Sequence, residues 1–266
     1  MTELTLRGYE FLRQRVLDAL ADVGRIALLV FATFRNLGRG LRAGRLVVEQ
    51  MHAIGVQSLM LVLIVSLFTG AVAAVQAAYQ FANVVPLKYI GSVILRSVII
   101  ELGPVLTALI VGGRVGSSVA AELGTMRVTE QIDALEAMGV SPVRYLVVPR
   151  VVAAVVMLPV LTVISDAIAI AGGMLVAVAS LGVSVHTYAT SLQQYFFIKD
   201  LESGLIKSVF FGAIIAWMGC YHGFRTEGGA EGVGRATTRA VVASCVQVLI
   251  VDYVLANVLF RFVFAQ

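Results

Sequence analysis

Three acidic residues inside long apolar stretches are the residues of this sequence best placed to do chemistry: Glu101, Asp166 and Asp252. If these stretches cross a bilayer, a carboxylate at the centre costs about 3 kcal/mol on insertion scales. Each is therefore expected to pair with a cation, to meet a helix terminus or to face a polar cavity. A transporter coupled to protons would need such carboxylates.

Glu101 has two interpretations. It lies three residues before Pro104, whose missing N–H leaves the Ile100 carbonyl without its helical bond and bends the helix. A carboxylate at such a bend can supply the polar part of a substrate cavity. It can also form a purely structural ion pair with Arg96 or Arg114, and both interpretations stay open.

Other kinds of site find little support. A P-loop needs Gly-Lys-Ser/Thr, and none of the three lysines follows a glycine, so we expect no ATP hydrolysis by that route and no enzyme. His52, His186 and His222 are far apart and fall at predicted helix ends, as interface residues do. Cys220 and Cys245 lie in apolar stretches and are interpreted as small core residues. No metal and no cofactor are expected.

Composition indicates the environment in which these residues work. The chain has 266 residues, of which 59% are hydrophobic and 14% charged, with a mean hydropathy of +0.92. Soluble domains average about 25% charged residues, so the sequence predicts an all-α integral membrane protein. The formal charge of +4 does not indicate nucleic-acid binding, because the positions of the basic residues explain it better.

Five segments are long and apolar enough to cross a bilayer, which takes about 20 residues. They are predicted at roughly 54–80, 90–113, 150–180, 204–224 and 238–262. The first is followed by a short outer loop ending near Pro86. Residues 181–203 suit an outer helix or loop, and the loop at 225–237 is glycine-rich.

The N-terminal unit, residues 1–48, differs from the remainder, 49–266. Apolar residues recur at steps of three and four over 3–34, with arginines and aspartates between them. This pattern predicts an amphipathic helix in the membrane interface, or one packed against the protein's own bundle, and the two are compatible. Arginines interleaved with glycines at 35–45 form a basic connector.

Basic residues are distributed unequally between the two sides that five spans define. One side carries Arg7, Arg13, Arg15, Arg25, Arg35, Arg39, Arg42, Arg45, Arg114, Arg127, Arg144, Arg150, Arg225, Arg235 and Arg239, and the other carries Lys88, Arg96, Lys199, Lys207 and Arg261. The richer side is expected to be cytoplasmic. This places the N-terminus and the segment 114–148 in the cytoplasm and the C-terminus outside.

A short amphipathic helix is predicted inside that central segment. Ile132, Leu135 and Met138 share one face, and Glu130, Asp133 and Glu136 lie on an adjacent polar one. Gly139 suits the position just after the helix, and Pro142 follows where it prevents continuation. Such a helix is either an ordinary loop helix or one that a partner outside the membrane can push.

Three motifs of the chain resemble one family. ELGPV at 101–105, the segment from Gly112 to Val140 and GRATTRAVV at 234–242 are similar, in order and spacing, to the MlaE-type permeases. These are the membrane subunits of lipid transporters that work with MCE-domain proteins. Asp133-Ala-Leu followed by Gly139 resembles the "EAA…G" coupling loop of ABC-transporter permeases, with Asp in place of the first Glu. The likeness runs from about residue 45 to the end, so it implies an MlaE-type permease domain at 49–266.

The resemblance implies a homodimer in the bacterial inner membrane, with a cytosolic ABC ATPase subunit and a periplasmic MCE-domain protein as partners. It implies a phospholipid or similar lipid as substrate and a role in outer-membrane lipid asymmetry. The helix at about 124–141 would be the coupling helix. Its ATPase-coupling residues would be Glu130, Asp133, Leu135, Glu136, Met138 and Gly139.

Substrate binding is assigned to the second span and its neighbour. Gln76 and Tyr79, near the outer end of the first span, are expected to line a cavity with Glu101 and Leu102, although ordinary helix packing also explains them. Two rival functions remain. One is a proton-coupled secondary transporter that uses Asp166 and Asp252, and the other is a non-transporting membrane scaffold.

The start of the fifth span carries a further group of polar residues. Arg235, Thr237, Thr238 and Arg239 follow the glycine-rich loop. They are expected to touch phosphates or the coupling helix, or simply to begin a helix at the membrane interface.

Overall fold

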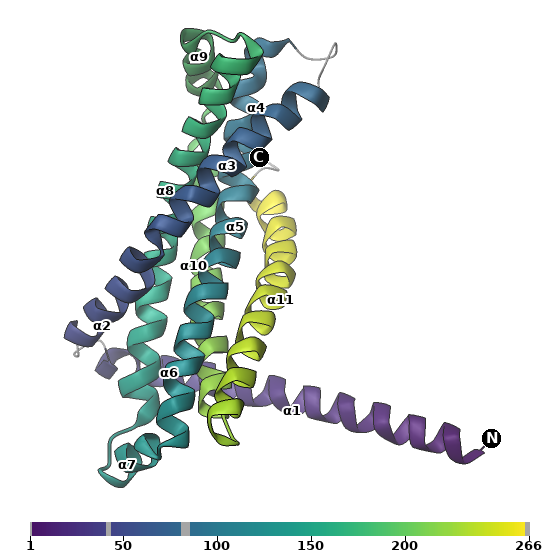
Figure 1. Ribbon diagram of the computed structural model, residues 1–266, viewed down its shortest axis with the longest axis vertical. Coiled ribbons are helices and arrows are strands. Elements are labelled where there is room, and N and C mark those ends of the chain that lie inside the picture. Colours follow the sequence, from purple (N-terminus) through teal and green to yellow (C-terminus); the bar gives the residue numbers. More distant parts are fainter. Residues whose placement is uncertain (1, 41–43, 81–85, 264–266) are drawn as a thin grey trace.

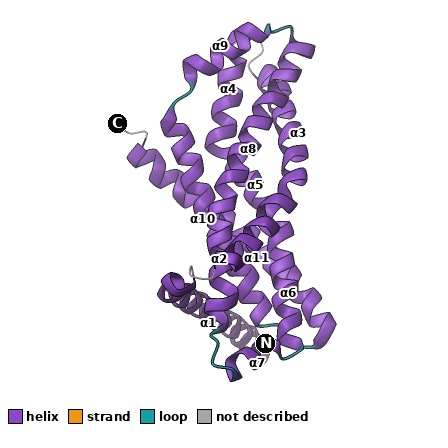
Figure 2. Ribbon diagram, turned by 90° about the vertical axis from the view of Figure 1, so that its left-hand side faces the viewer, coloured by secondary structure: helices purple, strands orange, loops and turns teal. Residues whose placement is uncertain are grey.

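The computed structural model describes residues 2–40, 44–80 and 86–263 of the chain. These described residues form helices joined by short turns, with no strand among them (Figure 2). The all-α prediction is confirmed. Arg42, part of the expected connector, and the expected outer loop at 81–85 lie outside the described residues.

Five helical segments of the described chain have the length and hydropathy of membrane spans: Gly44–Gln80, Ile90–Val128, Val143–Leu181, Ile198–Phe224 and Gly229–Arg261. The first comprises α2 (Gly44–Met51), the wide turn η1 (His52–Val56) and α3 (Gln57–Gln80). The third comprises η5 (Val143–Val147) and α8 (Val148–Leu181), the fourth is α10 (Ile198–Phe224), and α11 (Gly229–Val263) includes the fifth. The short helix α9 (Val185–Tyr195) caps the end of the bundle opposite α7 (Gln131–Ala137) (Figure 1).

The second span is longer than predicted. After η2 (Leu87–Tyr89) it runs through α4 (Ile90–Ser97), η3 (Val98–Leu102), α5 (Gly103–Val111), η4 (Gly112–Gly116) and α6 (Ser117–Val128). The sequence indicated an end near residue 113, but the helix continues because α6 packs against α10. Val119 and Leu123 are buried there, and a Cβ added at Gly223 would come 2.7 Å from the Leu123 Cβ.

Small residues let the spans approach closely, as in other membrane bundles. A Cβ at Gly70 of α3 would lie 1.7 Å from the Ala169 carbonyl oxygen of α8. A Cβ at Gly172 of α8 would lie 2.3 Å from the Leu67 carbonyl oxygen of α3. The α3–α8 contact is therefore backbone against backbone, and it holds the first and third spans together along most of their length.

The N-terminal helix α1 (Thr2–Gly40) lies across the end of the bundle near α7 and extends far to one side (Figure 1). Its last turns pack on the bundle: Thr33 is buried, and the Phe34 ring is 5.9 Å from that of Trp217. It also exposes a stripe of apolar side chains, consisting of Leu17, Leu20, Val23, Leu28, Phe31 and the outer part of Phe34. One helix thus contacts the bundle and also presents an apolar face.

Candidate functional site

The second span contains a widened helical turn beside Pro104. At η3 the Gly103 N–H donates to the Val98 carbonyl, five residues back. Pro104 has no N–H and its ring conflicts with the preceding turn, so the helix widens here instead of breaking. Wide turns of this kind often occur at functional sites. The turn carries Glu101 and Leu102, two of the predicted substrate-binding residues.

Glu101 belongs to a charged triad built from three spans. Lys207 Nζ of α10 lies 2.5 Å from Glu101 Oε2 and 2.9 Å from Asp252 Oδ1 of α11. The Lys207 side chain is 1% exposed, that of Asp252 14%, and that of Glu101 44%. One buried ammonium is therefore shared by two carboxylates, of which Glu101 is the more exposed.

The triad corrects two expectations. Glu101 pairs with Lys207, not with Arg96 or Arg114, and Lys207 lies inside the fourth span instead of marking its outer side. Arg96 instead pairs with Asp200 at 3.0 Å. Arg114 donates to Ser58 and Gln57, and so ties the second span to the first.

Two open grooves border the widened turn. One, of about 530 Å³, is lined by α3 side chains and contains Gln76 and Leu102. The other, of about 520 Å³, contains Arg96, Ile100 and Glu101. Adjacent residues of η3 thus face different grooves. Tyr79, which is 85% exposed, is not among the residues that line either groove, so the structure does not bring it together with Glu101.

Asp166 of α8 is buried near the same turn. A Cβ added at Gly103 would lie 1.7 Å from Asp166 Oδ1, which has no hydrogen-bond partner among the described residues. Asp252 Oδ1 also accepts no hydrogen bond of good geometry among the described residues, but it lies 2.9 Å from the Lys207 ammonium, which forms an ion pair with it. The two carboxylates of the proton-coupled alternative therefore stand in different surroundings.

The predicted loop helix is α7, and it is shorter than the expected 124–141 because residues up to Val128 continue α6. Gly139 has φ +73°, its N–H donates to the Glu136 carbonyl, and the Val140 N–H donates to the Leu135 carbonyl. This pair of bonds is the Schellman ending that favours glycine. The predicted helix end at Gly139 is confirmed.

The two faces of α7 differ as the sequence indicated, with one exception. Ile132 is buried and Leu135 packs partly against the core. Met138 lies at the C-cap and is 70% exposed, so it does not share the buried face. Asp133 and Glu136 are exposed.

The turn before α7 is held in an unusual conformation. Glu130 is exposed and adopts a left-handed backbone with φ 59°. Arg127, at the end of α6, forms an ion pair with Asp133 of α7. These features fix α7 at the end of the second span.

Three basic segments of the chain meet at one end of the bundle. The inner part of α1, the α7 region and the α10–α11 loop all lie there (Figure 1). Arg225 pairs with Asp22 of α1 at 2.5 Å, and the Tyr221 hydroxyl donates to the same carboxylate at 2.8 Å. The Tyr221 bond, together with Arg225, holds the pKa of Asp22 below its ordinary value. This contact fastens α1 to α10.

Sequence reasoning assigned no role to several of these residues. Lys207 was counted only among the basic residues of the outer side, although its place within the predicted fourth span was a signal that it needed an acidic partner. Arg150, whose side chain is 4% exposed, pairs with Glu122 at 2.8 Å and joins the third span to the second. No local pattern predicts such pairs, because their partners lie far apart in the sequence.

Comparisons with known proteins agree with this architecture. The family model described as "Permease MlaE" matches residues 47–258. A Rickettsia typhi protein named "Probable ABC transporter permease protein" is 43% identical over 240 residues, which cover 90% of this chain and 93% of that protein. The Haemophilus influenzae "Intermembrane phospholipid transport system permease protein MlaE" is 36% identical over 250 residues, covering 94% and 96%. The Arabidopsis thaliana chloroplastic protein "TRIGALACTOSYLDIACYLGLYCEROL 1" is 39% identical over 213 residues, covering 80% and 61%.

Proposed function

The chain belongs to the MlaE permease family, and we propose that this ABC transporter permease moves phospholipids between the bacterial inner membrane and a periplasmic MCE-domain assembly. The printed name of the Haemophilus influenzae relative, a phospholipid transport permease, supports a phospholipid substrate. The groove beside Gln76 and Leu102 suits acyl chains, since its other lining residues are mostly apolar. The groove beside Glu101 and Arg96 offers charged groups to a lipid head group.

The observation that carries this proposal is the continuity of the second span. A single run of helix joins the exposed α7 region to the widened turn that holds Glu101. A push on α7 would reach the turn through α6 and α5. The Arg150–Glu122 pair would carry the same push to the third span. Rigid helices that rock about such a turn can open and close a cavity.

A cytosolic ATPase would supply the push. In this mechanism, α7 docks on the ATPase with its exposed carboxylates, Asp133 and Glu136, and with the exposed Met138 side chain. Docking would bury the Met138 side chain within a rim of polar ones, which is the usual arrangement of a binding interface. Hydrolysis then belongs to the partner, and the permease contributes movement alone.

We assign the end that carries α1 and α7 to the cytoplasm, following the distribution of basic residues. The apolar stripe of α1 then lies in the cytosolic membrane interface. The spans made by α3 and α11 are buried along little of their length, so they face lipid or a second copy. A homodimer around these faces would enclose the two grooves.

The experiment that tests this function is the purification of the tagged permease from its native membrane, followed by mass spectrometry of bound subunits and lipids. We expect an ABC ATPase, an MCE-domain protein and near-stoichiometric phospholipid. A complex that contains the partners but lacks retained lipid would favour the scaffold. A permease that transports lipid without an ATPase, driven by a proton gradient, would favour the secondary transporter.

A further inference from the structure

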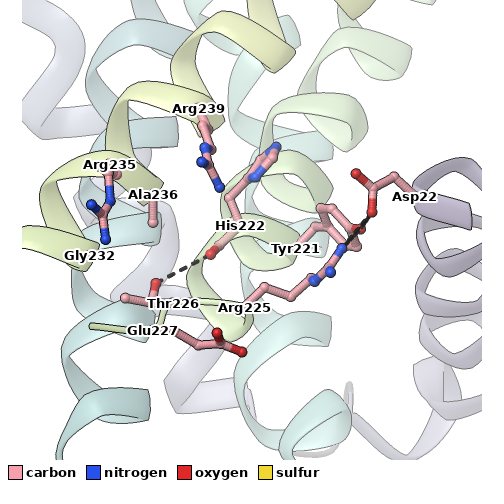
Figure 3. Close-up of a pocket in the computed structure, with 10 residues that line it drawn as sticks. All are labelled: Asp22, Tyr221, His222, Arg225, Thr226, Glu227, Gly232, Arg235, Ala236 and Arg239. Atoms are coloured by element: carbon pink, nitrogen blue, oxygen red, sulfur yellow. Dashed lines mark hydrogen bonds and ion pairs between the residues drawn. The ribbon is translucent and has the colours of Figure 1, made fainter. Parts of the chain in front are cut away.

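The end of the bundle that carries α1 has a third cavity, separate from the two grooves. Its volume is about 520 Å³, and it lies between α1, the end of α10 and the start of α11. Figure 3 shows Arg235 and Arg239 of α11 on one side, Arg225 and Asp22 on the other, and His222 between them. None of these residues lines the grooves beside η3.

The backbone around this cavity is tightly fixed. A Cβ added at Gly232 would lie 1.8 Å from the Glu227 carbonyl oxygen, so the loop folds directly onto the first turn of α11. Thr226 is buried, and its hydroxyl donates to the His222 carbonyl (Figure 3). The arginines therefore project from a rigid support, which reduces the entropy lost when they bind a ligand.

The three arginines that line the cavity differ in how far nearby carboxylates neutralise them. Arg225 is neutralised by Asp22, which also accepts from Tyr221 and pairs with Arg25. Arg235 pairs only with Glu231 among the described residues, through a surface contact in which the two side chains are 56% and 82% exposed. Such pairs are weak. The structure gives Arg239 no ion pair or hydrogen bond within its described part.

Arg235 and Arg239 are one helical turn apart on α11, so their like charges lie side by side. This arrangement is unfavourable for an isolated helix and becomes favourable when an anion sits between them. Arginine holds phosphate oxygens with paired N–H groups. The Glu227 carboxylate, also at the cavity, points away from these two guanidinium groups (Figure 3). The two arginines therefore suit an anion with several oxygen acceptors, such as a phosphate ester.

The two helices that line the cavity, α1 and α11, also carry exposed apolar side chains close in sequence to the lining residues. On α1, the exposed side chain of Val23 follows Asp22 in the sequence. On α11, Val242 and Val246 are exposed and follow Arg239 along the same face of the helix. We propose that this cavity binds the phosphate of an anionic phospholipid, with its acyl chains along the apolar surfaces of α1 and α11. The orientation proposed above would place this lipid in the cytosolic leaflet. The phosphate site itself does not depend on the transport function.

The test compares lipid binding to the purified full-length permease by native mass spectrometry, with phosphatidylglycerol and phosphatidylcholine as probes. Arg235→Gln/Arg239→Gln should weaken phosphatidylglycerol binding about tenfold, because each surface arginine contributes modestly to the attraction of anionic lipid. Phosphatidylcholine binding in the grooves should not change. Arg35→Gln/Arg45→Gln is the matched control, since it removes the same charge from exposed positions that do not line the cavity.

Arg239→Lys keeps the charge without the paired donors, and we expect it to bind phosphatidylglycerol with intermediate affinity. Soluble glycerol 3-phosphate provides the second arm of the test. Equal phosphatidylglycerol binding by the wild type and the double variant would overturn the proposal. The proposal would also be overturned if the double variant lost binding of glycerol 3-phosphate but bound phosphatidylglycerol as the wild type does. The occupant of the cavity would then be a soluble phosphate ester.

Discussion

The Lys207 ammonium lies 2.5 Å from the Glu101 carboxylate and so joins α10 to the widened turn of the second span. The same ammonium is 2.9 Å from Asp252 of α11. Three spans thus meet at one buried cation. Because burial of an unpaired charge is costly, these spans cannot separate here without large loss of stability.

Removal of that cation should destabilise the bundle. Lys207→Met leaves two carboxylates facing each other in an apolar setting, and loss of one partner of a buried pair costs about 3–5 kcal/mol. We expect a clearly lower thermal midpoint for the detergent-solubilised variant. Lys88→Met, which changes an exposed lysine, is the control. If both variants melt like the wild type, the triad does not hold the spans together.

Glu101→Leu should leave the complex assembled and reduce lipid transfer. The carboxylate is the most exposed member of the triad and lines a groove, so its loss removes a polar contact for a head group. A photo-crosslinking residue at Gln76 should capture labelled phospholipid, while one at Val178, outside the groove, should report bulk lipid. Equal capture at both positions, with normal transfer by Glu101→Leu, would remove the substrate path from this site.

The orientation can be tested with single cysteines. In a variant whose Cys220 and Cys245 are replaced, cysteines at Ser141 and Glu227 should resist an impermeant thiol reagent in intact cells. A cysteine at Lys199 should react. Glu227 is a better position than Gly228, whose φ of 87° disfavours a side chain. Labelling of position 141 from outside would reverse the topology and exclude contact between α7 and a cytosolic ATPase.

Asp166→Asn separates ATP-driven transport from proton coupling. The carboxyl is buried and has no partner for one oxygen among the described residues. A lone charge is very costly there, so an amide of the same shape should support folding and transport. We expect an unchanged rate of lipid transfer in proteoliposomes. Loss of transfer together with a lost response to a proton gradient would support the secondary transporter.

The five spans could be predicted because their apolar lengths are a local property of the sequence. The end of α7 could be predicted for the same reason, since Gly139 carries its own backbone preference. The end of the second span was misplaced because Arg114 and Glu122 resemble loop charges. In the structure, Arg114 bonds to Ser58, and Glu122 bonds to Arg150.

The substrate residues were only partly predictable. Gln76, Glu101 and Leu102 all lie near the widened turn, but Glu101 and Leu102, which are adjacent in the helix, line different grooves. Lys207 is separated from Glu101 by 106 positions. Its role follows from the packing of α10 on the second span, which periodicity alone does not specify.

The most direct test of the proposed ATP-driven mechanism is the transfer of labelled phospholipid from proteoliposomes that contain the permease with the ABC ATPase and the MCE-domain protein proposed as its partners. The wild type should transfer lipid with ATP and not with a non-hydrolysable analogue. Glu136→Lys should abolish or uncouple transfer, because charge reversal at a docked interface costs about 2–5 kcal/mol. Glu202→Lys, at an exposed position near the opposite end of the bundle, should behave like the wild type. Normal ATP-dependent transfer by Glu136→Lys would contradict a coupling role for α7.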